Sequence, residues 1–291
     1  MRYRITHTTT YLYKDLVPLC MNEAYLIPRS AGRQICHHHK ILIQPKTSRR
    51  FEREDYFQNR LLQFSIHKAH RRLDVTAMSE VTVLYPTIPW WAETPAWETL
   101  RANSEGSLDR LYFDAAQFRF DSPAITRSPD LADYAAPDFA RGQPILQAAA
   151  DLNARIHRDF QYDPGATNVK TRVEDVLQLR RGVCQDFAHL MIGCLRALGI
   201  PARYVSGYLR TASVDGGADL IGNVASHAWV AVWCGPETGW VELDPTNNSF
   251  GGLDHIVLAW GRDYFDVSPI KGILIGGGDQ EMQVSVDVTP V

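Results

Sequence analysis

Apolar and polar residues alternate along most of the first 85 residues of the chain. The alternation is visible in residues 3–13, 35–43, 61–66 and 75–85. A period of two places every second side chain on one face of a strand, so the pattern predicts short strands. Several such strands without a helical pattern between them indicate an antiparallel β-sandwich.

Helical spacing appears in the second half of the chain. Residues 145–160 and 172–179 carry apolar side chains three and four positions apart, and residues 184–198 carry a longer stripe of the same kind. We expect this third helix to have one buried face and to end at Gly199 and Pro201. Alternating strands are predicted to follow it at residues 202–209, 226–234, 240–244 and 282–288.

The segment between these two regions has neither period. Residues 86–97 (PTIPWWAETPAW) contain three prolines and three tryptophans, and further prolines interrupt the chain up to residue 144. We interpret residues 86–144 as a linker with short helices. The predicted organisation is an N-terminal β-sandwich at residues 1–85, this linker, and a catalytic core with a C-terminal strand at residues 145–291.

Composition and charge describe an ordinary globular protein. The 291 residues are 45% hydrophobic and 22% charged, and the net charge of −3 gives no reason to expect a nucleic-acid partner. No apolar run approaches the length of a membrane span, and the first residues lack the apolar segment of a signal peptide. We therefore expect a cytoplasmic protein without a membrane partner, and the sequence leaves its oligomeric state open.

The five cysteines are widely spread and form no C-x-x-C pair, which argues against disulfides and a structural zinc site. The run Cys36-His37-His38-His39 is a possible metal ligand set. In a strand, however, only His37 and His39 share a face, so an exposed strand face is the favoured interpretation.

Cys184 stands at the predicted start of the long helix. Free N–H groups and the positive end of the helix dipole favour a thiolate at that position, although a small packing residue is the alternative. A nucleophilic thiol also requires a base. His189 is an unsuitable one, because it lies about 140° around the helix and roughly 7 Å along it.

A predicted hairpin supplies a better base. His227 begins the strand at residues 226–234, and pairing of Trp233 with Trp240 across the Gly235 turn would place Asp244 diagonal to His227. A carboxylate in that position orients the imidazole and stabilises its charged form. Cys184, His227 and Asp244 together therefore predict a catalytic triad.

Three segments that contain these residues, GVCQDFAH, ASHAWVAVW and WVELDPTNN, resemble the signature segments of the transglutaminase-like core, a papain-like thiol fold. The resemblance covers residues 145–250. The first 85 residues resemble the β-rich N-terminal region of bacterial transglutaminase-like proteins, including a turn at DYFQN. Gln58 stands there where such proteins often have glycine.

The resemblance implies an α+β core in which a central helix packs on an antiparallel sheet. It also implies that Cys184 attacks the carbonyl of a peptide or protein substrate and that the thioester passes to an amine or to water. The chain would then be an acyltransferase or a hydrolase such as a cysteine protease. Tyr162, with Gln161 behind it, is the candidate second oxyanion donor beside the backbone N–H of Cys184, and packing is the alternative role for Tyr162.

No metal or cofactor is expected, since no calcium-loop pattern occurs; Asp215, Asp219 and Asn223 are interpreted as part of a loop at the rim of the cleft. A non-catalytic peptide-binding module of the same fold is the alternative function.

Overall fold

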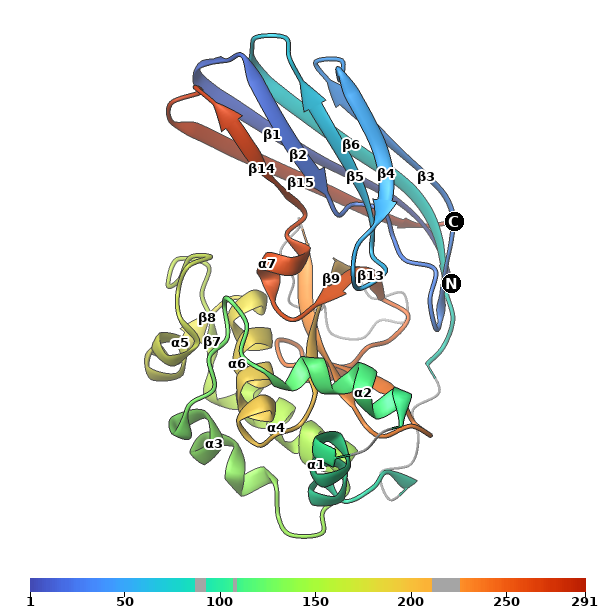
Figure 1. Cartoon of the computed structure of the whole chain (residues 1–291), viewed down its shortest axis with the longest axis vertical. Helices are drawn as coiled ribbons and strands as arrows, with labels where there is room; N and C mark the ends of the chain where they lie inside the picture. The colour runs from blue at the N-terminus through green and yellow to red at the C-terminus, as the bar shows by residue number, and fades with distance from the viewer. Residues whose placement is uncertain (87–92, 107–108, 211–225) are drawn as a thin grey trace.

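The computed structural model of the chain describes residues 1–86, 93–106, 109–210 and 226–291. The tryptophans Trp90 and Trp91 and the predicted rim residues Asp215, Asp219 and Asn223 lie outside these described residues. Figure 1 shows two layers of β-structure above a mixed helical and β-sheet body. The predicted combination of a β-sandwich with an α+β core is confirmed.

The sandwich consists of two four-stranded antiparallel sheets. In spatial order, the first contains β15 (Gln280–Pro290), β1 (Arg2–Val17), β6 (His70–Val83) and β3 (Gln34–Gln44). The second contains β14 (Ile270–Ile275), β2 (Leu19–Ala24), β5 (Arg60–Ile66) and β4 (Arg49–Glu54). Alternate side chains along β1 and β6 are buried, such as Tyr3 and Ile5 of β1, as their period of two predicts.

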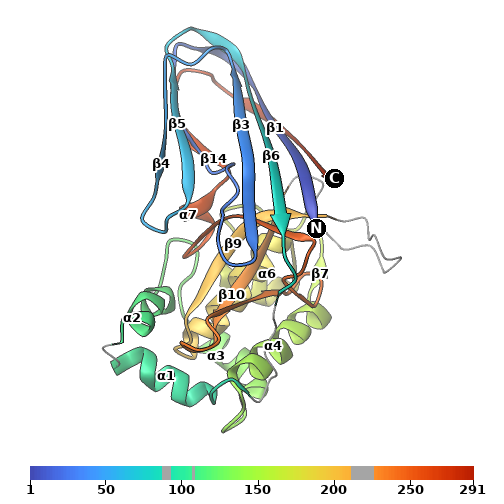
Figure 2. The same ribbon diagram turned by 90° about the vertical axis from the view of Figure 1, so that its right-hand side faces the viewer.

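The last part of the chain contributes one strand to each sheet of the sandwich. β15 pairs with β1, where Tyr3 lies opposite Pro290, and β14 pairs with β2, where Ile270 lies opposite Ala24. Figure 2 shows the two chain ends near each other at the sandwich. The sandwich therefore contains residues from both ends of the sequence, and the expected domain boundaries remain a prediction.

A five-stranded antiparallel sheet forms the centre of the core. In spatial order it contains β12 (Ser249–Phe250), β11 (Trp240–Asp244), β10 (His227–Trp233), β9 (Ala202–Leu209) and β13 (His255–Gly261). Helix α6 (Cys184–Ala197) packs against β9 and β10. Gly199, with φ +81°, follows its end as predicted.

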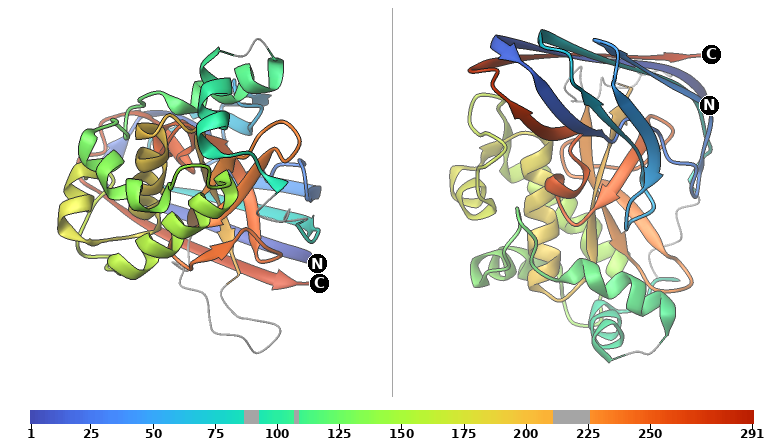
Figure 3. Two further views of the ribbon diagram at one scale, coloured as in Figure 1. Left: turned by 90° about the horizontal axis from the view of Figure 1, so that it is seen from below. Right: turned by 45° about the horizontal axis from the view of Figure 1, so that its top comes forward.

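The remaining helices of the core are short, apart from one of 15 residues. They are α1 (Trp97–Gly106), α2 (Arg110–Ala116), α3 (Pro129–Ala135), α4 (Ile145–Asp159), α5 (Val173–Leu179) and α7 (Tyr264–Val267), and the parallel pair β7 (Gln161–Tyr162) and β8 (Arg181–Gly182) lies just before α6. α3, α4 and α5 pack on α6 on the side away from the sheet (Figure 3). For this reason α6 is buried around most of its circumference, whereas its sequence predicted one buried face.

Two carboxamide side chains attach the sandwich to the edge of the core sheet. Gln34 donates to the carbonyl of Val257 and accepts from its N–H, both at 2.8 Å. Asn59 does the same with Trp260, at 2.8 and 3.0 Å. Asn59 ends the predicted turn at residues 55–59, in which Gln58 adopts a φ of 60°. These contacts satisfy backbone groups of the edge strand β13 and fix the sandwich on the core.

Gly207 of β9 lies where two neighbours leave no room for a side chain. A Cβ atom there would lie 2.1 Å from the carbonyl oxygen of Ile256 and 2.4 Å from the ring of Trp229. We expect Gly207→Ala to lower the free energy of unfolding by about 1–3 kcal/mol or more, since backbone and ring must both move. Urea unfolding would measure it. Gly106→Ala, where an added Cβ atom would meet no described atom within 4 Å outside its own turn of helix, is the control, and equal effects of the two changes would contradict this interpretation.

Candidate active site

The start of α6 is held by a buried carboxylate. Asp186 accepts a hydrogen bond from the backbone N–H of Val183 at 2.8 Å and another from the hydroxyl of Thr167 at 2.6 Å. Burial raises the pKa of Asp186, while these two donors act in the opposite direction. The cap places Cys184 as the first residue of the helix, with 9% of its surface exposed.

Cys184 lines a pocket of about 490 Å³ between the core and the sandwich. The core contributes residues from α6, β9, β10 and α7, and the sandwich contributes residues from β1 and β15. The residues that line its walls include His7, Thr9, Tyr11, Tyr162, Cys184, Gln185, Tyr204, His227, Tyr264, Met282 and Val284. Because the first and last strands of the chain form one wall, the sandwich takes part in shaping this pocket.

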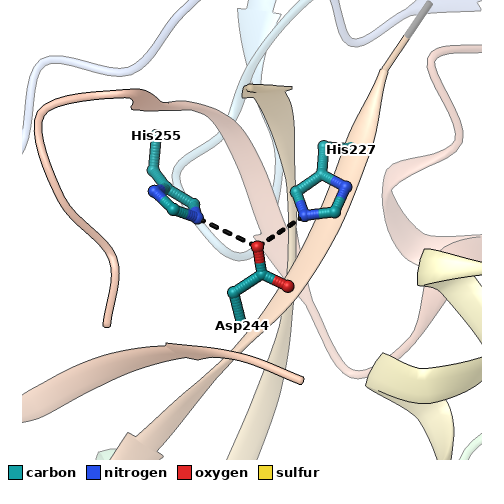
Figure 4. A group of neighbouring side chains, drawn as sticks. All are labelled: His227, Asp244 and His255. Atoms are coloured by element: carbon teal, nitrogen blue, oxygen red, sulfur yellow. Dashed lines mark hydrogen bonds and ion pairs between the residues drawn. The ribbon is translucent and has the colours of Figure 1, made fainter. Parts of the chain in front are cut away.

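The predicted hairpin forms with the expected register. Trp233 lies opposite Trp240, and Nε2 of His227 lies 2.8 Å from Oδ2 of Asp244 (Figure 4). Both side chains are buried. The structure thus brings His227 and Asp244 into contact, and it places His227 on the same pocket as Cys184.

A second histidine, which the sequence did not suggest, contacts the same carboxylate. Nε2 of His255, at the start of β13, lies 3.2 Å from Oδ2 of Asp244. The Nδ2 of Asn247 donates to this oxygen at 2.7 Å, and the backbone N–H of Thr246 donates to Oδ1 at 2.9 Å. These donors keep Asp244 charged in a buried position and fix its orientation.

The buried pair has strongly shifted proton affinities. Burial opposes the charged form of His227, but the Asp244 carboxylate outweighs it and, with a contribution from Cys184, raises the pKa of His227 to about 10. Burial also opposes the charged form of Asp244, yet the two histidines hold its pKa far below the usual range. The pair is therefore expected to exist as imidazolium and carboxylate at neutral pH.

The other ring nitrogen of His227 remains available for chemistry. Nδ1 of His227 is buried and makes no hydrogen bond of normal length with any described residue. Cys184 nevertheless lies near enough to influence the pKa of His227. An imidazolium held at Nε2 by a carboxylate, with Nδ1 near a thiol, can stabilise the thiolate that nucleophilic catalysis requires.

The two candidate oxyanion residues lie in different environments. Tyr162 lines the pocket with Cys184, and its ring packs edge-on against Phe187 of α6. Burial, followed by the neighbouring Cys184, raises the pKa of Tyr162 to about 12, so its hydroxyl keeps its proton and can donate. Gln161, the preceding residue of β7, is exposed and does not line the pocket.

His189 has the packing role that its position on the helix predicted. It is buried, its Nε2 accepts from the backbone N–H of Tyr264 at 3.2 Å, and its ring packs on Tyr204. Burial lowers its pKa to about 4. His189 is thus a neutral core residue.

His227, Asp244 and His255 form a set that could hold a metal ion by distance, because their ligand atoms lie within 4.8 Å of one another. Both imidazoles, however, direct Nε2 at the same oxygen of Asp244. That oxygen is also occupied by Asn247. The set is accordingly better described as a hydrogen-bonded network than as a metal centre.

The cysteine–histidine run in β3 has ordinary strand contacts. A β-bulge between Cys36 and His38 interrupts the pairing with β6. Nε2 of His37 contacts the hydroxyl of Thr82 at 2.8 Å, whereas His39 pairs with Glu52 at 3.1 Å. His37 and His39 thus contact different partners and do not converge on one point. This favours the interpretation as an exposed strand surface over a metal site.

The raised pKa of His227 predicts a pH-dependent contribution to stability. A histidine with a folded pKa of about 10 and an unfolded pKa of about 6.5 stabilises the fold fully below pH 6.5 and loses that effect as the pH rises toward 10. The stability of wild type relative to His227→Gln should therefore be largest between about pH 4 and 6.5 and fall above that range. Urea unfolding from pH 5 to 10 would measure this.

His189→Gln is the control with the opposite sign. The folded pKa of His189 is about 4, so the contribution of this residue is lost as the pH falls below 6.5. A pH-independent difference between wild type and His227→Gln would contradict the assigned ion pair.

Comparison with known proteins adds to this geometry. Residues 133–245 match the model of the transglutaminase-like superfamily, and residues 3–82 match that of the bacterial transglutaminase-like N-terminal region. An uncharacterized protein of Mycobacterium tuberculosis is 40% identical over 299 residues, which cover 99% of this chain and 93% of the relative. The protein-glutamine gamma-glutamyltransferase of Pseudomonas aeruginosa is 38% identical over 110 residues, covering 37% of this chain and 16% of that protein.

Among solved structures, a candidate cysteine protease from Cytophaga hutchinsonii has the same fold. It aligns with a TM-score of 0.79 and 22% identity over 99% of this chain and 90% of that one.

Within the part of the chain that the structure describes, no helix combines the length and apolarity needed to cross a membrane.

Proposed function

The chain belongs to the transglutaminase-like superfamily, and from this premise we propose that it catalyses acyl transfer or amide hydrolysis on a peptide-like substrate through the thiol of Cys184. The observation that carries the proposal is the buried His227–Asp244 pair at 2.8 Å, on the same pocket as Cys184. A histidine held in this way can activate the thiol of Cys184, which is the first residue of helix α6.

In the proposed reaction the sulfur of Cys184 attacks the carbonyl carbon of the substrate amide. The imidazolium of His227 pairs with the thiolate of Cys184 and then gives its proton to the leaving amine, while Asp244 stabilises the imidazolium. The resulting thioester is resolved by an amine or by water. The backbone N–H of Cys184 and the hydroxyl of Tyr162 are the proposed donors to the oxyanion.

The substrate is proposed to be a protein or peptide, with a glutamine side chain as the first acyl donor to test. The name of the Pseudomonas aeruginosa relative suggests this donor. A pocket with walls from both the core and the sandwich suits one extended segment better than a bulky surface.

The cytoplasmic location stays a prediction; all five cysteines are free.

Selective labelling of Cys184 tests the thiol. Burial raises the pKa of each of the other four cysteines, Cys20, Cys36, Cys194 and Cys234, which disfavours their thiolates. We expect iodoacetamide to label Cys184 at least about tenfold faster than any other cysteine at pH 7, measured by peptide mass spectrometry. Equal labelling of all five would favour the non-catalytic peptide-binding module.

The reaction itself is tested with glutamine-containing peptides and a labelled primary amine, comparing wild type with Cys184→Ala. Incorporated amine indicates transfer, cleaved peptide indicates proteolysis, and ammonia alone indicates deamidation. The proposed function would be excluded if wild type formed none of the three products and Cys184 were labelled no faster than the other four cysteines.

A further inference from the structure

A second cavity lies on the other face of the core sheet. It has a volume of about 340 Å³ and is lined by residues from β9, β11 and β13. Residues from the segment 29–34, which leads into β3, complete the lining. Arg203 and Tyr204 are neighbours on β9, so they point to opposite faces of the sheet. Tyr204 lines the Cys184 pocket and Arg203 lines this cavity, which is therefore a separate site.

Arginine and tryptophan side chains alternate along one wall of the cavity. The guanidinium carbon of Arg29 lies 3.5 Å from the ring centre of Trp260, and that of Arg203 lies 3.7 Å from the same centre. Two guanidinium groups at such distances must occupy opposite faces of the indole. Arg203 also lies 4.4 Å from the ring centre of Trp240. The order is thus Arg29–Trp260–Arg203–Trp240, which we call the arginine–tryptophan stack.

Stacking uses the faces of the Arg203 guanidinium and leaves its edge without a partner. All its N–H donors lie in the guanidinium plane. No described residue accepts a hydrogen bond from them, and no described carboxylate lies within 4.0 Å; the Nε of Arg203 is buried without a partner. The stack consequently holds a planar donor edge in a fixed position, as recognition of an oxyanion requires.

The charges around the cavity also favour an anion. Its described lining contains three arginines, Arg29, Arg33 and Arg203, and one carboxylate, Glu242. Glu242 already pairs with Arg33 at 2.8 Å and accepts from Nε1 of Trp229 at 2.9 Å. Within the described part of the chain, Arg29 donates to two neutral acceptors, the carbonyl of Phe57 and the side chain of Asn59. Two of the three positive charges therefore have no described carboxylate within 4.0 Å, and Asp55 and Glu242 act on Arg29 and Arg203 only from farther away.

We propose that this cavity binds a small molecule through a carboxylate or phosphate group, with the edge of Arg203 as the main contact and Arg29 and Arg33 adding positive potential. The volume lies in the range of small-molecule sites. Glu242 and Trp229 connect the cavity to the network of His227, because Trp229 packs edge-on against His255 at 5.1 Å. The proposal itself does not rest on the proposed reaction.

Isothermal titration calorimetry on the full chain tests the proposal, with sodium phosphate and sodium benzoate as probes and chloride at equal ionic strength as reference. We expect one probe or both to bind. Phosphate binding alone identifies a phosphate-bearing ligand, and benzoate binding alone identifies a carboxylate. No binding of either probe would overturn the proposal.

Two variants locate the binding. Arg203→Gln removes the donor edge and should weaken binding at least about tenfold, whereas Arg4→Gln, an exposed arginine of β1 that does not line the cavity, should leave it unchanged. Because Arg203→Gln also disturbs the stack, Thr238→Glu at the cavity wall provides a second variant that leaves the stack intact. It should compete with the anion and weaken binding similarly, while Thr238→Gln should not. Unchanged binding in both Arg203→Gln and Thr238→Glu would overturn the assignment.

Discussion

Replacement of Asp244 by asparagine is expected to slow acylation of Cys184 about 10³- to 10⁴-fold. Oδ2 of Asp244 accepts from Nε2 of His227, which leaves Nδ1 as the ring nitrogen available to the thiol. An asparagine amide in that place can present its NH₂ group instead, which favours the other tautomer, and it cannot stabilise the imidazolium. The rate of thioester formation with an activated acyl donor, followed by mass spectrometry, measures the loss.

A second buried aspartate provides the matched control. Asp263 is also fully buried, it accepts backbone hydrogen bonds from Ala124 and Phe265, and it does not line the Cys184 pocket. Asp263→Asn should affect stability more than acylation. A folded Asp244→Asn variant, verified by circular dichroism, that acylates at the wild-type rate would exclude Asp244 from the proposed mechanism.

Trp229→Ala is expected to produce the largest loss of stability, about 3–5 kcal/mol in the free energy of unfolding. Trp229 is fully buried on the face of the core sheet opposite α6, in a cluster with Val205, Ala231 and Val257. The change creates a cavity and also removes the donor to Glu242. Urea unfolding monitored by circular dichroism would measure the effect.

Trp97→Ala is the corresponding control. Trp97 is only partly buried, and its Nε1 donates to the carbonyl of Ala140 at 3.0 Å. A smaller loss is expected there, because less apolar surface returns to water. Equal losses in the two variants would contradict the central packing role assigned to Trp229.

The contacts that the sequence predicted well are local ones. The register of the β10–β11 hairpin followed from alternation and the glycine turn, and it placed Asp244 beside His227. The contribution of His255 could not be predicted in this way. His255 begins β13, which pairs with β9 and not with β11, so its contact with Asp244 depends on the order of strands across the whole sheet.

The same limit explains two other differences. Periodicity predicted a last strand at residues 282–288, but it carries no information on the partner strand, which is β1 at the other end of the chain. Likewise, the arginine–tryptophan stack joins residues near position 29 to residues beyond position 200. Gln161 and Tyr162 were both candidate oxyanion residues, and only Tyr162 lines the pocket because adjacent residues of the strand β7 point to opposite sides.

Because β15 pairs with β1, the sandwich can be completed only after the end of the chain has been synthesised. A ribosome that has completed β6 must add nearly 200 further residues before β15 emerges, which takes roughly 10–40 s at usual elongation rates. During this interval the outer edge of β1 has no partner, and β2 likewise waits for β14. Unpaired strand edges can associate with other chains. The N-terminal region of a nascent chain is therefore exposed to aggregation until the sequence beyond the core has been translated.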